Sequence, residues 1–517
     1  MRKENPYAVQ QFEGINLFLN QSILPDNVFV YCKNMYLNTI GLYEKTKGTT
    51  KYNSVDWTTN GAIGFQNGIR YYWGGTNKKL LVAIQKTAPA NDEILVGDDA
   101  NNSFSVVTGG TDLGSVKEYS FVTWIDKCYI SNGTAPIQFT TDGITKADLT
   151  GTNIPKGKFL IVYKDRLYVA GDPALPSAVY PSNALDPTTF NSPDVLTFYC
   201  GHNDGDVITG MGILAVSTDT QGLRGQLAIF KNHSVYILDG DIQGGSLSQV
   251  SGSIGCVAYK TIINTSIGLI FFGENDVYLL RLGGDIQAIG TPIRSAIQDI
   301  PIAQRRLACA GYDAISGYYR LSFATPGSPY NNIQYWLDIR QVDSLKWVGP
   351  ITYPNTNCFI PAFSQEDSVM GAGSVLGDYL YLLDQEDYTH DGAEIESEIL
   401  TKKYDFGLPY VDKILNWVNV VAQKNELSLS PISLFINVDD GIETSTATIT
   451  GGSTAGLWDV AQWDQGIWGG EFLKSYLLWA DKRLFGKRFQ FLLNHKANEK
   501  VMIGGISAGI KMIRRFS

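Results

Sequence analysis

Histidine is scarce in this chain, with four residues among 517. No two of them are spaced as zinc ligands are, and a nucleophilic triad would need a histidine beside its nucleophile. The scarcity argues against zinc chemistry and against a histidine-dependent hydrolase. We therefore expect no zinc site and no catalytic histidine. The four are His202, His233, His390 and His495.

Paired cysteines and long apolar runs are missing as well. The six cysteines stand singly at positions 32, 128, 200, 256, 309 and 358, and no CxxC occurs. Several lie beside strand-like apolar runs, so we expect buried free thiols in a reducing compartment. No stretch approaches roughly 18 uninterrupted apolar residues, and the first residues lack an apolar signal core. We expect neither a cleaved signal peptide nor membrane insertion.

Charged residues are few, at 18% of the chain, and the net charge is −10. Such an acidic chain is not built to grip nucleic acid or an anionic membrane. Residues 474–517 differ, because they contain ten Lys/Arg but only two acidic residues, Asp481 and Glu499, a net charge of +8. The remaining 473 residues therefore carry a net charge of −18. This basic segment is a candidate contact for an acidic partner. The isolated pair Arg305-Arg306 is more typical of solvated surface.

Glycine and aromatic residues are abundant instead: 53 Gly, 28 Tyr, 23 Phe and 10 Trp. Frequent turns and aromatic strands favour an all-β protein. Long helical patterns are nearly absent, and one short helical element is expected around residues 295–306.

A turn residue followed by an apolar, Tyr-centred strand recurs seven times, with intervals of 58, 39, 68, 42, 41 and 62 residues between the tyrosines. A unit of about 40 to 60 residues is typical of a β-propeller blade, a four-stranded sheet whose faces pack against the next blade. The pattern predicts roughly six or seven blades, with the tyrosines in their cores. These are Tyr71, Tyr129, Tyr168, Tyr236, Tyr278, Tyr319 and Tyr381.

The sequence predicts three domains. Residues 1–60 form an extended N-terminal arm with strands, residues 61–392 the β-propeller, and residues 393–517 a C-terminal, jelly-roll-like β-sandwich. The character of the chain changes after Asp391-Gly392. Strands of the sandwich are expected at 415–422, 432–438, 444–450, 488–493 and 501–506.

Three acidic patterns could suggest chemistry. The Asp-Gly-Asp tracts at 204–206 and 239–241 could hold Ca²⁺, but neither continues into an EF-hand spacing, so turn formation is favoured. Glu394, Glu396 and Glu398 share one strand face at a separation that glycosidases use. Nothing nearby would raise one pKa over another, so a solvated strand face is favoured. The sialidase Asp-box is also missing from every repeat.

Residues 457–470 contain three tryptophans at intervals of five, a spacing that fits neither face of a regular strand or helix. Packing between subunits, packing within the domain and stacking on sugar all remain open. Together with the basic segment, the tract supplies a candidate partner interface. Its residues are Trp458, Trp463, Trp468, Lys487, Arg488, Arg514 and Arg515.

Three groups of residues carry a family resemblance and follow one another along most of the chain. The first is Leu-Pro-Asp-Asn at 24–27, Asn-Met-Tyr at 34–36 and Gly-Thr-Thr-Lys-Tyr at 48–52. The second is residues 165–173 with 179–182 and 185–187; the third is residues 401–407, the tryptophan tract and residues 486–491. They resemble the β-propeller tail proteins of short-tailed bacteriophages, called tail nozzle, tail hub or packaged-DNA stabilisation proteins.

The resemblance implies a structural virion protein without cofactor or catalytic residue, made in the host cytoplasm and located in the tail. It implies a homohexameric ring that contacts the portal–adaptor ring and other tail proteins. The ring would retain packaged double-stranded DNA and conduct it during ejection without sequence recognition. An acidic wall, from the −18 balance, would repel phosphate and let DNA slide.

Two alternatives stay open. One is a carbohydrate-binding or glycan-degrading virion protein that recognises the host surface through a propeller face and the tryptophan tract. The other is a cellular propeller scaffold for protein–protein contacts.

Overall fold

The computed structural model describes residues 5–513 except 117, 217–223, 361–370, 375, 425–429, 440, 442, 450–454, 457–466 and 469–472. Within this part the chain is nearly all-β, with three short 3₁₀ helices (η) and two short α-helices. It divides into two compact units. Unit 1 comprises Met1–Thr49, Tyr335–Thr352 and Asp384–Ser517, and unit 2 comprises Thr50–Gln334 and Tyr353–Leu383. No helix of the described residues is long and apolar enough to cross a membrane.

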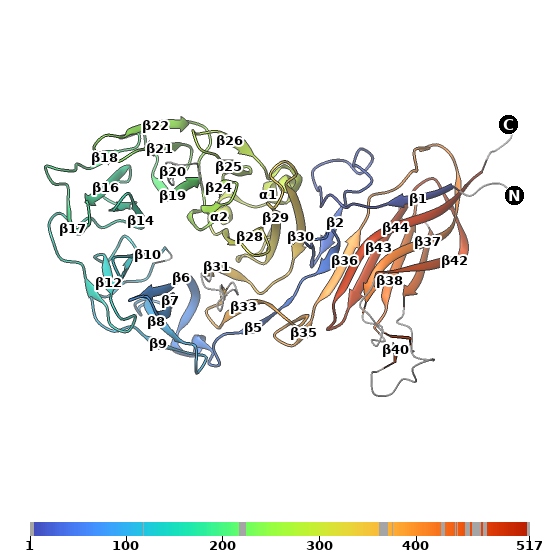
Figure 1. Cartoon of the computed structure of the whole chain (residues 1–517), viewed down its shortest axis with the longest axis horizontal. Coiled ribbons are helices and arrows are strands. Elements are labelled where there is room, and N and C mark those ends of the chain that lie inside the picture. Colours follow the sequence, from blue (N-terminus) through green and yellow to red (C-terminus); the bar gives the residue numbers. More distant parts are fainter. Residues whose placement is uncertain are drawn as a thin grey trace. The chain divides into compact units, whose positions relative to one another are not determined.

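Unit 2 consists of antiparallel sheets that follow one another along the chain (Figure 1). In each, consecutive strands pair as hairpins, so each sheet is a local unit of sequence. The first five sheets are β6 (Ala62–Trp73), β7 (Asn77–Lys86), β8 (Glu93–Asp98), β9 (Ser103–Val106); β10 (Ser120–Trp124), β11 (Lys127–Ser131), β12 (Gln138–Thr140), β13 (Ala147–Asp148); β14 (Phe159–Tyr163), β15 (Arg166–Ala170), β16 (Ala178–Asn183), β17 (Asp186–Phe190), with β18 (Phe198–Tyr199) on β16; β19 (Ile208–Val216), β20 (Arg224–Lys231), β21 (Val235–Asp239), β22 (Ser246–Ser251); and β23 (Ile263–Thr265), β24 (Gly268–Phe272), β25 (Val277–Leu280), β26 (Ile286–Ala288).

Two further sheets follow. One begins with β27 (Cys309–Asp313), which pairs with β28 (Tyr318–Phe323). The other begins with β31 (Thr356–Ile360), which pairs with β32 (Gly371–Ser374), and β32 pairs in turn with β33 (Leu380–Gln385). The strands β29 (Ile333–Asp338) and β30 (Lys346–Ile351) follow β28 along the chain. The helical element expected at 295–306 is two short helices, α1 (Arg294–Gln298) and α2 (Ile302–Arg305). The 3₁₀ helices are η1 (Trp57–Asn60), η2 (Tyr259–Thr261) and η3 (Thr291–Ile293).

The innermost strands close a ring. Contacts run from β6 to β10, β14, β19, β23, β27 and β31, and from β31 back to β6. The chain also returns to the last sheet at its start, because Tyr52 N donates to Leu380 O at 2.7 Å and Leu380 N donates to Asn53 Oδ1 at 2.8 Å. Unit 2 is therefore a closed seven-bladed β-propeller, in agreement with the predicted fold class.

Apolar clusters fill the spaces between neighbouring blades. Leu81 and Ile94 of the first blade pack with Cys128 and Ile130 of the second. All six cysteines are buried and free, as the sequence predicts. Burial raises the pKa of Cys358 to about 11, so this thiol stays protonated at neutral pH and serves as a packing group.

Five of the seven recurring tyrosines are buried, but not at equivalent places, and Tyr278 and Tyr381 are half-buried. Tyr71 belongs to an innermost strand, Tyr129 and Tyr168 to second strands, and Tyr236 to a third strand. All four are at most 8% exposed. The blades themselves are unevenly spaced, since β6, β10 and β14 begin at residues 62, 120 and 159, and this spacing gives the first two sequence intervals.

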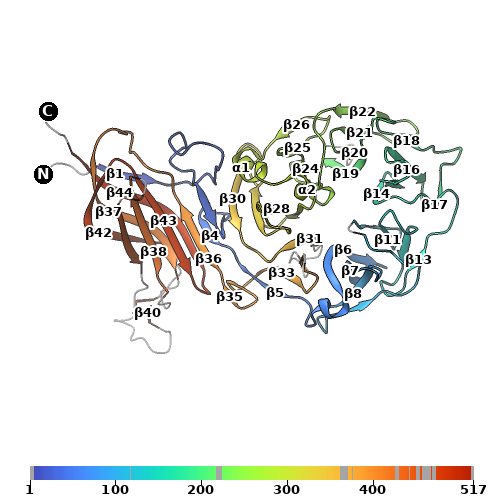
Figure 2. The ribbon, with the colours of Figure 1, turned by 180° about the vertical axis from the view of Figure 1, so that it is seen from behind.

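Unit 1 is a β-sandwich of two sheets. One has the order β3-β4-β44-β37-β42 with β1 paired to β44, and the other has the order β2-β36-β43-β38-β39. Figure 2, seen from behind, shows β1 beside β44. The bounds are β1 (Asn5–Val9), β2 (Tyr31–Lys33), β3 (Met35–Leu37), β4 (Tyr43–Lys45), β36 (Glu396–Leu400), β37 (Lys413–Lys424), β38 (Ile432–Val438), β39 (Glu443–Ile449), β42 (Lys474–Gly486), β43 (Phe489–Lys496) and β44 (Val501–Met512), with the short strands β5 (Gly48–Lys51), β34 (Thr389–His390), β35 (Ala393–Glu394), β40 (Ala455–Gly456) and β41 (Ile467–Trp468).

The first 45 residues thus belong to the sandwich, whereas the sequence predicts an arm over residues 1–60 and a sandwich over 393–517. β1 and β4 pair with β44, and β2 pairs with β36. Each partner lies more than 350 residues away in sequence, where a local pattern carries no information about pairing. The five strands expected in the sandwich correspond to β37, β38, β39, β43 and β44, while β42 was not expected.

Candidate functional site

The propeller axis holds a cavity of about 280 Å³ to which all seven innermost strands contribute. We call it the central channel. Its lining is largely apolar and aromatic, and Lys260 is the one charged residue among the described residues that line it. The strand residues that line it include Ile69, Phe121, Phe159, Met211, Ile263, Ala310 and Phe359.

The helix η2 places Tyr259 and Lys260 in this channel. The Tyr259 ring lies 5.4 Å from that of Phe159, and Tyr119 N donates to its hydroxyl at 3.4 Å. Burial, followed by the nearby Glu118 carboxylate, raises the pKa of Tyr259 well above its usual value. The Tyr259 phenol therefore stays neutral at neutral pH and does not act as a base. Its ring forms part of the channel wall.

A second cavity, of about 340 Å³, also has Tyr259 and Lys260 in its wall. We call it the mouth cavity. It lies at the end of the axis where innermost strands begin, since it is lined by Gln66 near the start of β6, Asn357 near the start of β31, and Arg306 before β27. Lys260 Nζ donates to the Asn357 carbonyl at 3.1 Å. More polar and charged side chains line the mouth cavity than line the channel behind it.

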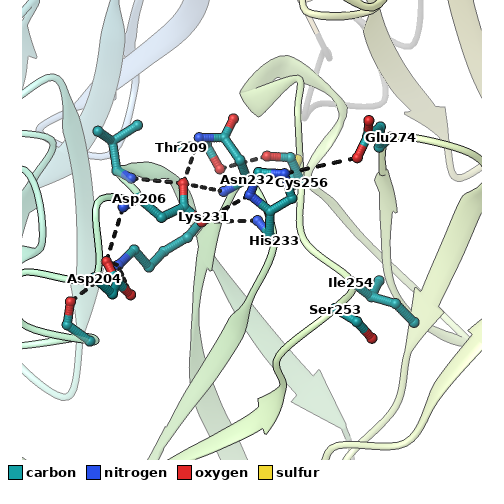
Figure 3. Close-up of polar contacts among 12 residues, drawn as sticks. Asp204, Asp206, Thr209, Lys231, Asn232, His233, Ser253, Ile254, Cys256 and Glu274 are labelled. Atoms are coloured by element: carbon teal, nitrogen blue, oxygen red, sulfur yellow. Dashed lines mark hydrogen bonds and ion pairs between the residues drawn. The ribbon is translucent and has the colours of Figure 1, made fainter.

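The two carboxylates of the Asp-Gly-Asp tract at 204–206 are bonded to neighbouring residues of the chain (Figure 3). Lys231, whose side chain is fully buried, places Nζ 2.5 Å from the nearer Asp204 carboxylate oxygen. The same ammonium donates to Ser177 Oγ at 3.2 Å and to the Cys200 carbonyl at 3.0 Å. Because a lysine holds the carboxylate, this tract is a loop anchor and not a Ca²⁺ site.

Asp206 anchors the neighbouring turn. Its carboxylate accepts from Asn232 Nδ2 at 2.7 Å and from His233 N at 3.0 Å. Burial opposes its ionisation, but these hydrogen bonds lower the pKa of Asp206 below its usual value. The exposed His233 ring lies between Asp206, at 3.5 Å, and Glu274, at 3.9 Å. Among the described residues, no group of three or more His, Cys, Asp or Glu could hold a metal ion.

The glutamate row is also structural. Glu396 and Glu398 lie in β36, whereas Glu394 belongs to β35. Lys33 Nζ lies 2.7 Å from Glu396, and Asn494 Nδ2 donates to both β36 carboxylates at 3.1 and 2.9 Å. These hydrogen bonds lower the pKa of Glu396. The Glu396 carboxylate is therefore not held protonated as a general acid would be.

A buried charge cluster lies in unit 1. His495 Nε2 is 2.8 Å from Glu499 Oε1, Lys424 Nζ is 3.9 Å from the same oxygen, and Lys45 Nζ donates to the Ala497 carbonyl at 2.5 Å. All four side chains are at most 7% exposed. Burial lowers the pKa of Lys45 to about 8 and also lowers that of His495. These contacts connect residues of β4, β37 and β43 with the segment at residues 497–499.

The first and third groups of family-like residues meet in unit 1. Lys402 Nζ donates to the Leu24 carbonyl at 2.6 Å and lies 2.5 Å from the Asp26 carboxylate. Tyr404 donates its hydroxyl to the Asp26 carbonyl at 2.9 Å, and its backbone N and O bond to Phe489. Segments separated by nearly the whole chain thus form one interlocked region.

Beside this region is a cleft of about 420 Å³, which we call the sandwich cleft. It is lined by the loop at residues 16–22, by Val30, and by the charged residues Lys403, Asp405 and Arg488. The Asp439 carboxylate holds the turn below it, accepting from Arg488 N at 2.9 Å. The Arg488 guanidinium is exposed and has no partner within the described part of the chain. Nearby exposed apolar side chains are Phe18, Leu19 and Ile23, at 47%, 38% and 65%.

The predicted interface residues are only partly described. Lys487 and Arg488 are both exposed, and Arg488 lines the sandwich cleft. Trp458, Trp463, Arg514 and Arg515 lie outside the described residues, as does the side chain of Trp468, whose backbone is in β41. The mouth cavity was not predicted, because its residues are scattered along the chain. Of its residues, the sequence pattern singles out only Arg306, as half of the basic pair Arg305-Arg306.

The chain is therefore an all-β protein that combines a seven-bladed propeller with a β-sandwich. No protein-family model and no curated protein matches it. Among solved structures, a chain of the mitotic checkpoint complex is 12% identical with a TM-score of 0.41, covering 68% of this chain and 97% of that one. YCF48 bound to D1 peptide is 10% identical with a TM-score of 0.38, covering 66% and 98%. An exo-β-1,3-galactanase from Phanerochaete chrysosporium is 10% identical with a TM-score of 0.25, covering 76% and 97%. Likeness at this level carries no argument about function.

Proposed function

We propose that the chain is a non-enzymatic structural protein of a bacteriophage tail, a nozzle or hub located in the virion. Six copies form a ring on the portal–adaptor axis, where they retain packaged double-stranded DNA and conduct it during ejection. The observation that supports this most is the junction at Tyr404. Residues 24–27, 401–407 and 486–491, which carry much of the resemblance to such tail proteins, hydrogen-bond into one region of unit 1.

The way in which the candidate carboxylates are paired also favours a structural role. The carboxylates at 204–206 and in β36 are held by lysines, amides and backbone N–H groups. The central channel, at about 280 Å³, is smaller than an ordinary small-molecule site of roughly 300–1,000 Å³. A DNA duplex would therefore pass through a lumen between copies and not through a propeller axis.

The sandwich cleft is the surface that we assign to a tail neighbour. It combines the Arg488 guanidinium, which pairs with none of the described residues, with exposed apolar side chains of the loop at residues 16–23. Aromatic and arginine side chains are enriched at protein interfaces, and a basic rim selects an acidic partner. The portal–adaptor ring and other tail proteins are the candidate partners.

Electron microscopy of the purified protein and of the virion tests the proposal. We expect six-fold rings, and in virions the ring on the portal axis. Arg488→Glu should lower the fraction of protein joined to its neighbour, while Lys156→Glu, at an exposed site in unit 2, should not. Monomers at all concentrations, or peripheral trimers on the virion, would refute the role. A basic lumen in the assembled ring would refute the acidic wall.

The carbohydrate-binding alternative is separated by a different measurement. Loss of binding to host polysaccharide in Trp463→Ala and Trp468→Ala would favour it. Unchanged binding would favour packing of this tract.

A further inference from the structure

Arg306 stands out among the arginines of unit 2. Within the described part of the chain its guanidinium has no hydrogen-bond or ion-pair partner, although it lines the mouth cavity. Every other arginine of this unit whose side chain is described is held by a carboxylate or a carbonyl. They are Arg70 with Asp99, Arg166 with Asp241, Arg281 with Asp285, Arg294 with Asp276, Arg305 with the Ile300 carbonyl, and Arg320 with Asp313.

A chain of hydrogen bonds runs along the wall beside it. Lys260 Nζ donates to the backbone carbonyl of Asn357 at 3.1 Å. The side-chain Nδ2 of Asn357 donates to Gln66 Oε1 at 3.2 Å. Gln66 Nε2 then donates to Gln85 Oε1 at 3.1 Å. The side-chain amides of Asn357, Gln66 and Gln85 thus follow one another in the same donor-to-acceptor direction. The Gln85 NH₂ is the last donor, and no described residue accepts a hydrogen bond from it. The wall therefore offers donors.

The charges of the mouth cavity are unequal. Lys260 and Arg306 are cationic, and Glu118, whose carboxylate lies 2.5 Å from Lys158 Nζ, is the one acidic residue of the lining. Because Lys158 compensates Glu118, the Lys260 and Arg306 cations are left to attract an anion. Leu307 and Tyr330 add apolar surface to the same wall. At about 340 Å³ the cavity lies within the size range of small-molecule sites, roughly 300–1,000 Å³.

We propose that the mouth cavity binds a small monocarboxylate. Its carboxylate accepts from the Arg306 guanidinium, whose planar fork fits two oxygens, and is attracted by the Lys260 ammonium. The Gln85 amide donates to a hydroxyl or a second acceptor of the ligand, and the ring or carbon skeleton packs against Leu307 and Tyr330. This site does not depend on the proposed role in a phage tail.

Isothermal titration calorimetry on the full chain tests the site with two carboxylate probes, benzoate and glucuronate. Their neutral counterparts, benzyl alcohol and glucose, and inorganic phosphate complete the set. We expect binding of at least one carboxylate and none of its neutral counterpart. Arg306→Gln, at an exposed position, should weaken binding at least about tenfold, because the charge-assisted fork is lost. Arg306→Lys keeps the charge without the fork and should fall between.

The matched control is Arg281→Gln, because Arg281 is similarly exposed but pairs with Asp285. This variant should bind like the unmodified chain. Binding that is unchanged in Arg306→Gln, or absent for both carboxylates, would overturn the proposal. Phosphate binding as tight as carboxylate binding would overturn the preference for a carboxylate, whose two oxygens the guanidinium fork fits. Melting curves of each variant, unchanged within about 2 °C, show that the fold is kept.

Discussion

Lys231 shows how single residues of this chain use a buried charge. Its ammonium satisfies the Asp204 carboxylate, a hydroxyl and a backbone carbonyl at once. Lys231→Met removes all three contacts. We expect a loss of about 2–3 kcal/mol in the free energy of unfolding, at the low end for a broken buried pair because Asp204 is 37% exposed and can be hydrated.

Urea unfolding of the two proteins measures this loss. Lys156→Met is the control, since Lys156 is exposed and has no partner within the described part, and it should change stability by less than about 0.5 kcal/mol. Equal effects of the two substitutions would show that the Asp204 contacts contribute nothing.

His390, in β34 of unit 1, makes the stability of that unit depend on pH. Burial, with Lys45 nearby, lowers its pKa to about 4, although Asp387 opposes the shift. The unfolded chain, with a pKa of about 6.5, binds a proton first as the pH falls. The stability of the neutral form is therefore complete above about pH 6.5 and is lost as the pH falls toward about 4, by up to roughly 3 kcal/mol.

His390→Gln should remove this part of the pH dependence. Unfolding curves between about pH 7.5 and about pH 4.5 are compared for the unmodified chain and the variant. The exposed His202 serves as control, because His202→Gln should leave the pH dependence as it is. If His390→Gln and the unmodified chain lose stability in parallel, burial of His390 is not responsible.

At the scale of elements, η2 is the piece that separates the central channel from the mouth cavity. Tyr259→Ala removes its half-buried ring, which packs on Phe159. The substitution should cost about 2–3 kcal/mol, less than the roughly 3–5 kcal/mol of a fully buried aromatic residue. Tyr259→Phe keeps the ring and should stay within about 1 kcal/mol of the unmodified chain. Denaturant unfolding decides between them, with Tyr410→Ala, at a side chain 90% exposed, as the neutral control. Equal stability of all three would mean that the ring is not packed.

The propeller could be predicted from its elements, but the rank of each strand could not. A large aromatic residue is favoured wherever a strand faces the gap between blades, and innermost, second and third strands all do so. Tyr71 and Tyr236 therefore look alike in sequence while occupying different strands. The strand β42 was not predicted, because its residues 474–486 include four charges that broke the apolar pattern.

The candidate sites were harder to predict than the strands. Arg305 and Arg306 are adjacent, yet Arg305 is buried against backbone carbonyls and Arg306 is exposed in the mouth cavity. Nothing local distinguishes them, because the difference arises from how the ends of several blades meet. The same holds for Gln66 and Asn357, which hydrogen-bond across 291 positions.

At the scale of the whole molecule, the two ends of the chain build one domain. The sequence places residues 1–60 in an arm, whereas β1 pairs with residues 506–510 of β44 and the Leu24 carbonyl accepts from Lys402. Long-range pairing of this kind costs chain entropy and is invisible in local patterns. It makes the N-terminal residues part of the core that holds the sandwich.

A chain that begins at residue 28 tests this arrangement. It lacks β1 and the carbonyls of Leu24 and Asp26, so the partners left behind should open more easily. We expect amide hydrogen exchange at residues 506–510 and 402–406 to accelerate at least about tenfold, because each lost contact lowers the local free energy of opening. Exchange in β20 and β21, deep in the propeller, is the internal control and should not change. An N-terminal segment that is merely an extended arm predicts the opposite result, with exchange in β44 equal in the full and shortened chains.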